Sequence, residues 1–147
     1  MVGPGLRLIK RIEVDFMLRY SLSFLCVALI ATMVGAQEKP KHTTDSIQTV
    51  KENIKNEKAL LLDVREQKEW DAGHLKAARL VPLSKLSAAK DAKSVKDVGK
   101  DKILYLHCRS GRRVLQAAEQ LQAMGYDARP LKWGYEALMD EGFEKAK

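Results

Sequence analysis

The sequence lacks an apolar run long enough to cross a membrane. Its main uncharged apolar stretch, residues 21–34, is shorter than the roughly 20 residues that a membrane-spanning helix needs. The composition, with 46% hydrophobic and 31% charged residues, is that of a globular protein and matches neither a fibrous, a disordered nor a polytopic membrane protein. We therefore expect one globular domain, with no membrane span in its mature form.

The apolar stretch has the pattern of a secretory signal peptide. Arg19 lies just before it, and the small residues Gly35 and Ala36 follow it, as at a cleavage site. We predict cleavage after Ala36 and export to a periplasm or to the cell exterior. An uncleaved membrane anchor is the alternative. Acidic residues near the beginning are unusual in a leader, so Met17 is a possible true start.

Cysteine is scarce, because the chain has 2 cysteines. The predicted cleavage removes Cys26 and leaves only Cys108. The mature domain then cannot form an internal disulfide, although export would place it in an oxidising compartment. A buried cysteine that acts as a small hydrophobic residue is one interpretation. Whether the Cys108 thiol is reactive depends on the residues around it.

The sequence also lacks the features of a nucleic-acid interface and of a metal site. The lysine-rich stretch 85–102 contains interleaved aspartates but no cluster of aromatic residues, so a solvated helical face is a better interpretation than a nucleic-acid interface. The net charge of +7 favours anionic partners in general. The histidines do not form a metal-ligand set with the single cysteine, so we expect neither a metal nor a cofactor. These scattered histidines are His42, His74 and His107.

Behind a predicted signal peptide at 1–36 and a polar linker at 37–45, residues 46–147 show alternating strand and helix patterns. Short apolar runs predict buried strands, and apolar residues at helical spacing predict helices. The expected strands are 59–64, 80–83 (ended by its proline), 102–107 and 128–131, and the expected helices are 46–56, 111–124 (stopped by Gly125) and 135–139. This alternation predicts an α/β domain with a mainly parallel sheet.

Cys108 follows the strand that ends at His107 and precedes the helix that opens at Gly111. In open α/β sheets the ligand site lies beyond the carboxyl ends of the strands, which is the position of Cys108. Backbone N–H groups in such a turn, together with the positive end of the helix dipole, favour the thiolate. Gly111 permits a backbone conformation that a side chain would hinder.

Arginines surround this cysteine. Arg112 and Arg113 oppose the dipole of the helix that they open, at a cost of about 0.3–1 kcal/mol each when exposed. A local rule broken without visible compensation is typical of a functional site. An anion bound between Arg109 and these two residues would relieve the repulsion. The loop therefore predicts a nucleophilic thiolate beside a small-anion pocket.

Four motifs, taken in order, resemble the successive signatures of the rhodanese family. They are Leu62-Asp63-Val64-Arg65-Glu66, Glu69-Trp70, Gly73-His74-Leu75 and Cys108-Arg109-Ser110-Gly111-Arg112-Arg113. The resemblance covers about residues 46–143, and four ordered motifs are far more specific than one. It implies a rhodanese-like three-layer α/β domain with a mainly parallel five-stranded central sheet flanked by helices.

The resemblance also implies a chemistry. Cys108 would attack the outer sulfur of a small anionic donor such as thiosulfate, release sulfite and hold the sulfur as a persulfide. The persulfide would pass to a thiol, to cyanide or to a protein acceptor. The loop amides would cradle the sulfur, and the side chains of Arg109 and Arg113 are candidate anion contacts. The implied substrate-binding residues are Arg109, Ser110, Gly111, Arg112 and Arg113.

The other motif residues are predicted to support the site. Asp63, Arg65 and Glu69 carry opposite charges, so an ion-pair network that holds the strand end is the preferred interpretation. His74 follows Gly73 in a turn and is expected to be a hydrogen-bonded structural histidine. Trp133 stands where many family members have a glycine, and we predict that it narrows the pocket from its rim.

Two alternatives remain open. A phosphatase or arsenate reductase of the same fold would place its arginine at the sixth position after the cysteine, whereas here Val114 stands there and Arg113 comes one position earlier. The shorter loop suits a sulfur atom better than a tetrahedral oxyanion. A non-enzymatic sulfur carrier or binding module is the second alternative.

Overall fold

The computed structural model describes residues 38–88, 95 and 98–147. The predicted signal peptide, its cleavage point, Met17 and Cys26 lie outside these residues, as does much of the lysine-rich stretch. Lys39–Lys147 form a compact unit of their own, and the following description concerns that unit. In the part of the chain that is described, no helix has the length and apolar character needed to span a membrane.

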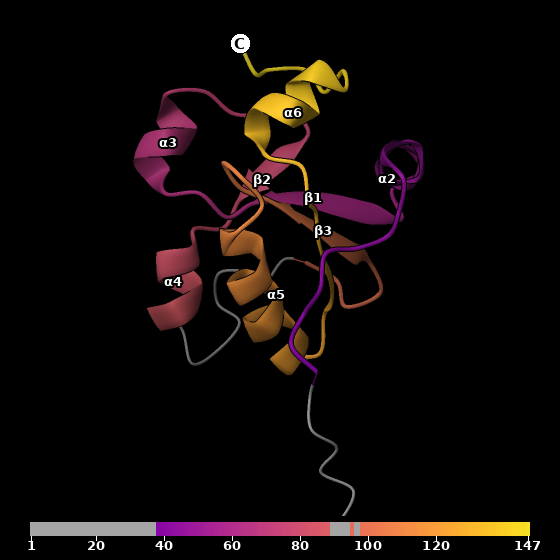
Figure 1. The fold of residues 1–147 in the computed structure, drawn as a ribbon, viewed down its shortest axis with the longest axis vertical. Helices are drawn as coiled ribbons and strands as arrows, with labels where there is room; N and C mark the ends of the chain where they lie inside the picture. The colour runs from indigo at the N-terminus through magenta and orange to yellow at the C-terminus, as the bar shows by residue number, and fades with distance from the viewer. Residues whose placement is uncertain (1–37, 89–94, 96–97) are drawn as a thin grey trace, which may run out of the picture. The chain divides into compact units, whose positions relative to one another are not determined.

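A parallel sheet lies at the centre of the unit (Figure 1). Its strands follow the order β2-β1-β3-β4, and every neighbouring pair is parallel. The strands are β1 (Ala59–Asp63), β2 (Ala78–Leu80), β3 (Ile103–His107) and β4 (Asp127–Pro130). In this register Asp63 lies opposite His107, so the carboxyl ends of the two central strands meet at one edge of the sheet.

Helices cover both faces of the sheet. They are α2 (Ile47–Lys55), α3 (Gln67–Asp71), α4 (Leu83–Ala88), α5 (Arg113–Ala123) and α6 (Tyr135–Asp140). Leu104 and Leu106 of β3 pack in one hydrophobic cluster with residues of α4 and α5, whereas Tyr105 packs in a second cluster with residues of α2 and α6. This alternation along a strand produces three layers, and Figure 1 shows α5 and α2 on different sides of the strands. The predicted α/β class is confirmed.

The sheet has four strands among the described residues, whereas five were expected. At its β4 edge, the Thr43 N–H donates a hydrogen bond to the Pro130 carbonyl (2.8 Å). Residues around Thr43 have no regular strand structure. The segment before α2 therefore touches the edge at a point and does not extend the sheet there.

The strand expected at 80–83 needs a correction. The strand is Ala78–Leu80, and Leu83 already belongs to α4. The Pro82 carbonyl accepts hydrogen bonds from the N–H groups of Lys85 (3.0 Å) and Leu86 (3.1 Å). Proline is favoured at the beginning of a helix because its φ is already helical and it needs no N–H partner there. Pro82 therefore opens a helix, and does not simply end a strand.

The helix that follows the cysteine loop ends as predicted at Gly125. This glycine has a φ of +83°, and the Tyr126 N–H donates to the Leu121 carbonyl (3.1 Å). The Gly125 N–H donates to the Gln122 carbonyl (2.9 Å). Together these bonds form a Schellman motif, which satisfies the last carbonyls of the helix.

Candidate active site

The Cys108 thiol is buried at the point where β3 ends and the loop begins. Its exposed fraction is 0%, and it packs in the same hydrophobic cluster as Leu106 and Val114. The Gly111 N–H donates a hydrogen bond to the Cys108 sulfur at 3.2 Å. The loop therefore turns back far enough for one of its own amides to stabilise negative charge on the sulfur.

Two glycines allow the loop to pack this tightly. Gly111 has a φ of +81°, and a Cβ atom there would lie 2.7 Å from the Lys132 carbonyl oxygen. A Cβ atom on Gly134 would lie 2.0 Å from the Arg109 carbonyl oxygen. The Tyr135 N–H also donates to the Cys108 carbonyl (2.9 Å). The backbone that leads into α6 thus packs directly against the cysteine loop.

Arg113 is the cation held beside the sulfur. Its guanidinium donates to both carboxylate oxygens of Glu69, at 2.6 and 2.7 Å. The hydrogen bond from Arg113 is the main reason that the pKa of Glu69 falls to about 2. The pKa of Arg113 is raised, chiefly by Glu69 and in smaller part by the neighbouring Cys108 sulfur. Glu69 therefore orients Arg113 and compensates the charge that opposes the dipole of α5.

Asp63 and Arg65 form a separate ion pair. The Arg65 Nε and one terminal nitrogen donate to the Asp63 carboxylate at 2.7–3.0 Å, and the pair is almost fully buried. Arg65 also donates to the Gly73 carbonyl (2.8 Å) and lies 4.2 Å from the centre of the Tyr135 ring. The predicted ion pair of Asp63 and Arg65 is present, whereas Glu69 binds Arg113, and Arg65 makes only a smaller electrostatic contribution to the lowered pKa of Glu69.

His107 is a residue next to the site that the sequence analysis did not assign to it, as are Tyr135, Glu136 and Lys145 of the cavity wall. It is fully buried, and neither ring nitrogen has a hydrogen-bond partner. Its Nε2 lies 3.7 Å from an Asp63 carboxylate oxygen. Burial lowers the pKa of His107 to about 4, so the ring is neutral at pH 7. A histidine inside an apolar run, next to the candidate nucleophile, is the signal that could have identified it.

An open cavity of about 420 Å³ lies beside the loop. Its walls come from α3, from the turn after α3, from the loop and from α6. They are formed by Arg65, Glu69, Ala72, Gly73, Arg109, Tyr135, Glu136, Met139 and Lys145. Arg109 is thus the loop arginine that faces this space. Ser110 and Arg112 are exposed but do not contribute to its walls.

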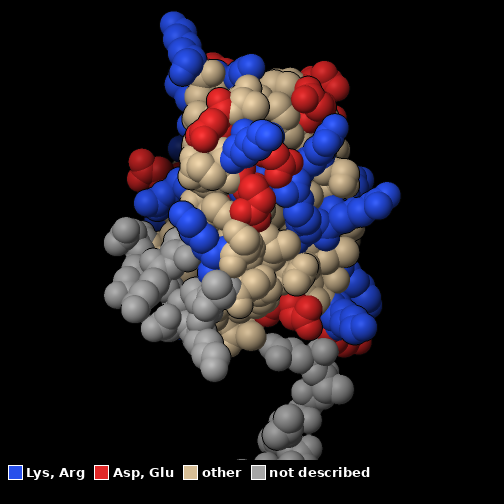
Figure 2. Space-filling model, turned by 90° about the vertical axis from the view of Figure 1, so that its left-hand side faces the viewer, with Lys and Arg blue, Asp and Glu red and all other residues tan. Residues whose placement is uncertain are grey.

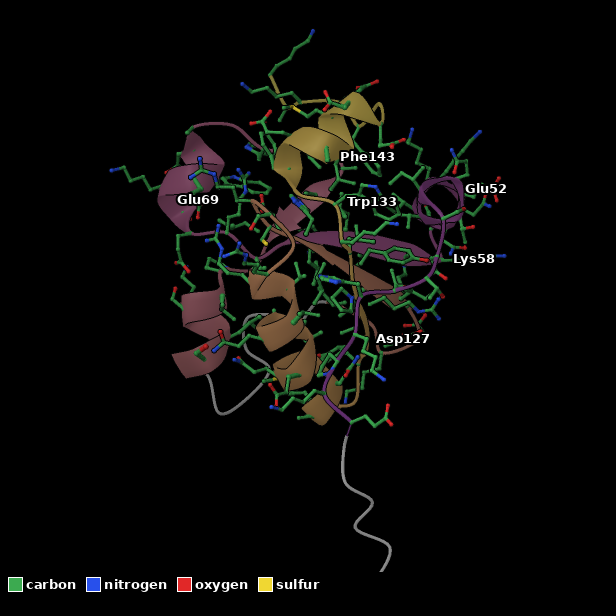
Figure 3. All side chains as sticks on the ribbon, viewed as in Figure 1. Glu52, Lys58, Glu69, Asp127, Trp133 and Phe143 are labelled. Atoms are coloured by element: carbon green, nitrogen blue, oxygen red, sulfur yellow. The ribbon has the colours of Figure 1, made fainter. Side chains whose placement is uncertain are left out.

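Trp133 does not border this cavity, so the expected narrowing of its rim is not observed. Trp133 packs against the hydrophobic cluster that contains Leu131 and Leu138. Figure 3 shows it on the side of Phe143, away from Glu69. The indole is apolar and large, and it gains more contact area between the sheet and the helices than at a solvated rim.

His74 lies in the turn after α3, where its ring stacks on Trp70. The ring centroids are 3.7 Å apart, with 10° between the planes. The Nδ1 atom of His74 lies 3.2 Å from the Trp70 carbonyl oxygen. These contacts give the ring a structural role within its own turn.

Among the described residues, no three histidine, cysteine or carboxylate side chains lie close enough together to hold a metal ion.

A cysteine loop at the carboxyl edge of a parallel sheet, with a carboxylate-held arginine beside the sulfur, defines a class of cysteine-dependent α/β domains. The family model described as "Rhodanese-like domain" matches residues 46–141. The chain belongs to the rhodanese-like domain family, and the family resemblance inferred from the four motifs is confirmed.

Relatives support this assignment. A curated protein of Bacillus subtilis (strain 168), "Uncharacterized protein YqhL", is 40% identical over 68 residues, which are 46% of this chain and 50% of that protein. The chain thus spans about half the length of this curated relative. The human single-domain sulfurtransferase TSTD1 is 27% identical with a TM-score of 0.58, over 69% of this chain and 98% of that one. A rhodanese-like domain protein from Staphylococcus aureus is 28% identical with a TM-score of 0.53, over 66% and 91% of the two chains.

Proposed function

We propose that this protein is a sulfurtransferase that carries sulfane sulfur as a persulfide on Cys108. The observation that carries the proposal is the pairing of the Cys108 sulfur with the Gly111 N–H at 3.2 Å, with Arg113 held beside it by Glu69. The Gly111 amide, which donates to the sulfur, and the positive charge of the neighbouring Arg113 stabilise the negative charge that a thiolate and a terminal persulfide both carry. The similarity to human TSTD1, which is named as a sulfurtransferase, supports the same function.

The proposed reaction with thiosulfate is a displacement at sulfur. The Cys108 thiolate attacks the outer sulfur, and a new sulfur–sulfur bond forms on the protein. The bond between the outer and the inner sulfur breaks, and sulfite leaves with the electron pair. The terminal sulfur of the persulfide keeps one negative charge, which the loop is arranged to stabilise. A nucleophilic acceptor such as cyanide or a thiolate then removes that sulfur and restores the Cys108 thiolate.

Loop length favours sulfur over phosphate or arsenate. A tetrahedral oxyanion in a longer cysteine loop needs a cation at the sixth position after the cysteine, but here Val114 is fully buried in the hydrophobic cluster. Arg113, one position earlier, is already bound to Glu69. This arrangement supports a compact sulfur site and argues against a phosphatase.

Mass spectrometry of the intact protein tests the proposal. Incubation with thiosulfate should add one sulfur atom to the wild-type protein and none to Cys108→Ser. Addition of cyanide should then remove the sulfur and release thiocyanate in many cycles per protein molecule. Release of no more than one equivalent would support a carrier instead of an enzyme. Absence of any sulfur gain in the wild-type protein, with thiosulfate and with organic persulfide donors, would falsify the proposal.

A further inference from the structure

The segment that follows α6 folds back onto the turn after α3. The Lys76 N–H donates to the Glu144 carbonyl (2.8 Å), and the Ala146 N–H donates to the His74 carbonyl (2.9 Å). Leu75 and Lys145 form an antiparallel bridge between these bonds. Backbone pairing on both sides of Lys145 therefore places this residue at the wall of the cavity, next to the cysteine loop.

The Lys145 ammonium and the Tyr135 hydroxyl converge at Gly73. A Cβ atom built on Gly73 would lie 3.1 Å from the Lys145 Nζ and 3.2 Å from the Tyr135 hydroxyl oxygen. Both residues line the cavity. The Tyr135 hydroxyl is buried and has no hydrogen-bond partner. Buried hydroxyl groups are almost always paired, so an unpaired one beside an ammonium indicates a position for a ligand acceptor atom.

The charges of the cavity wall also favour an anion. Arg65 is neutralised by Asp63, and Glu69 is neutralised by Arg113. Within the described ranges, no ion pair engages Arg109, Lys145 or Glu136, the remaining charged residues of the wall. Two cations thus face one carboxylate. Figure 2 shows Lys and Arg side chains interspersed with Asp and Glu side chains on the face that carries α3 and α4.

We propose that Lys145, together with the Tyr135 hydroxyl, forms a specificity-determining subsite for the oxyanion end of the sulfur donor. The donor class is a dianion with a sulfonate-type group, such as thiosulfate, whose oxygen atoms contact Lys145 and Tyr135 while its outer sulfur is directed toward the cysteine loop, whose Arg109 lines the same cavity. Glu136, on the same wall, opposes the binding of such an anion. This inference rests on the proposed sulfurtransferase function and assigns the donor end of that site.

Steady-state kinetics with thiosulfate as the varied substrate and cyanide as the acceptor test the subsite. Lys145→Gln should raise KM about fivefold and change kcat by less than about twofold, because the lost contact binds the donor equally before and during the transfer. Glu136→Gln should lower KM about twofold, since it removes a repulsive charge. Lys147→Gln is the matched control, because it removes the same charge from an exposed residue outside the cavity wall, and its KM should equal that of the wild type.

Tyr135→Phe keeps the ring over Arg65 and removes only the hydroxyl. It should raise KM for thiosulfate about threefold, and it should leave KM for an organic persulfide donor without a sulfonate group unchanged. Lys145→Gln should show the same selectivity between the two donors. Equal KM values for Lys145→Gln and Lys147→Gln would overturn the inference, as would an equal rise in KM for donors with and without a sulfonate group.

A second measurement separates failure of the subsite from failure of the proposed function. Calorimetric titration of Cys108→Ser with thiosulfate reports donor binding without sulfur transfer. Weaker binding after the additional change Lys145→Gln supports the subsite, even if the wild-type protein gains no sulfur. If the wild-type protein does gain sulfur and the two Cys108→Ser proteins bind thiosulfate equally, the subsite is wrong and the sulfurtransferase function stands.

Discussion

At the scale of single residues, the surroundings of Cys108 consist of groups whose charges are held by neighbours. Glu69 holds Arg113 beside the sulfur, and Asp63 neutralises Arg65. His107 is buried next to Asp63, and neither of its ring nitrogens has a hydrogen-bond partner. We therefore expect substitutions of Glu69 and of His107 to change activity and stability in different ways.

Glu69→Gln should lower kcat/KM for thiosulfate about tenfold, which corresponds to about 1.4 kcal/mol of lost transition-state stabilisation. The amide cannot neutralise Arg113, so the guanidinium is free to leave the sulfur. Stability at pH 7 should fall much less, because the ion pair is partly solvated, with side-chain exposures of 31% and 32%. Steady-state rates and urea unfolding of the same samples check this. A larger loss of stability than of activity would show that Glu69 acts mainly on the fold.

His107 should make the protein sensitive to mild acid. Its pKa is lowered from 6.5 to about 4 in the folded chain, so the folded state resists a proton that the unfolded state accepts. Stability from the neutral ring is complete above pH 6.5 and falls as the pH decreases toward about 4, with a slope of at most about 1.4 kcal/mol per pH unit. Urea unfolding across this range should show that slope in the wild type and a flatter profile in His107→Leu. Parallel profiles would contradict the assignment.

At the scale of elements, the site depends on the contact between the cysteine loop and the turn before α6. Gly134 has an ordinary φ of −82°, so backbone conformation does not require a glycine there. The requirement is steric, since the Arg109 carbonyl oxygen occupies the place of a Cβ atom. The loop and α6 thus form one unit, which the hydrogen bond from Tyr135 to Cys108 completes.

Gly134→Ala should therefore displace the loop. We expect a loss of about 1–3 kcal/mol in the free energy of unfolding, as for an overpacked site, together with a strong loss of sulfur loading on Cys108. Gly125→Ala is the matched control, because its φ of +83° strains an alanine but its position at the end of α5 is far along the chain from the loop. The control should lose about 1 kcal/mol and keep normal loading. Equal loading in both variants would contradict the steric argument.

At the scale of the whole molecule, the sheet separates two hydrophobic clusters, one on each of its faces. The cysteine belongs to the cluster on the α4 and α5 side of the sheet, while Trp133 belongs to the cluster on the α2 and α6 side. Tyr135 of this second cluster also lines the cavity, whereas Trp133 does not, so a substitution of Trp133 should change stability and leave the donor site unchanged.

Trp133→Gly tests this separation. We expect a loss of about 2 kcal/mol in the free energy of unfolding, less than for a fully buried tryptophan because the indole is half-buried. The KM for thiosulfate should match that of the wild type, since Trp133 is outside the cavity wall. Chemical denaturation and steady-state kinetics measure the two effects. A changed KM with unchanged stability would restore the idea that Trp133 shapes the donor site.

Local patterns along the chain were sufficient to predict much of the fold. Apolar runs placed β1, β3 and β4 to within one or two residues, and Gly125 marked the end of α5 correctly. The position of Cys108 after a buried strand and before a helix also follows from neighbours in sequence. The end of a helix, the burial of a strand and the length of a loop depend on residues a few positions apart. They can therefore be predicted from the sequence alone.

Only the tertiary structure decided which distant groups meet. Glu69 pairs with Arg113 across 44 positions, although Arg65 is much nearer in sequence. Lys145 reaches Gly73 because the chain after α6 folds back on the turn after α3. Trp133 turned toward the core, where apolar area is buried, and not toward the cavity. Side-chain direction and long-range pairing depend on how the layers pack, so the sequence by itself determined the candidate nucleophile and its loop, whereas packing determined the groups that surround them.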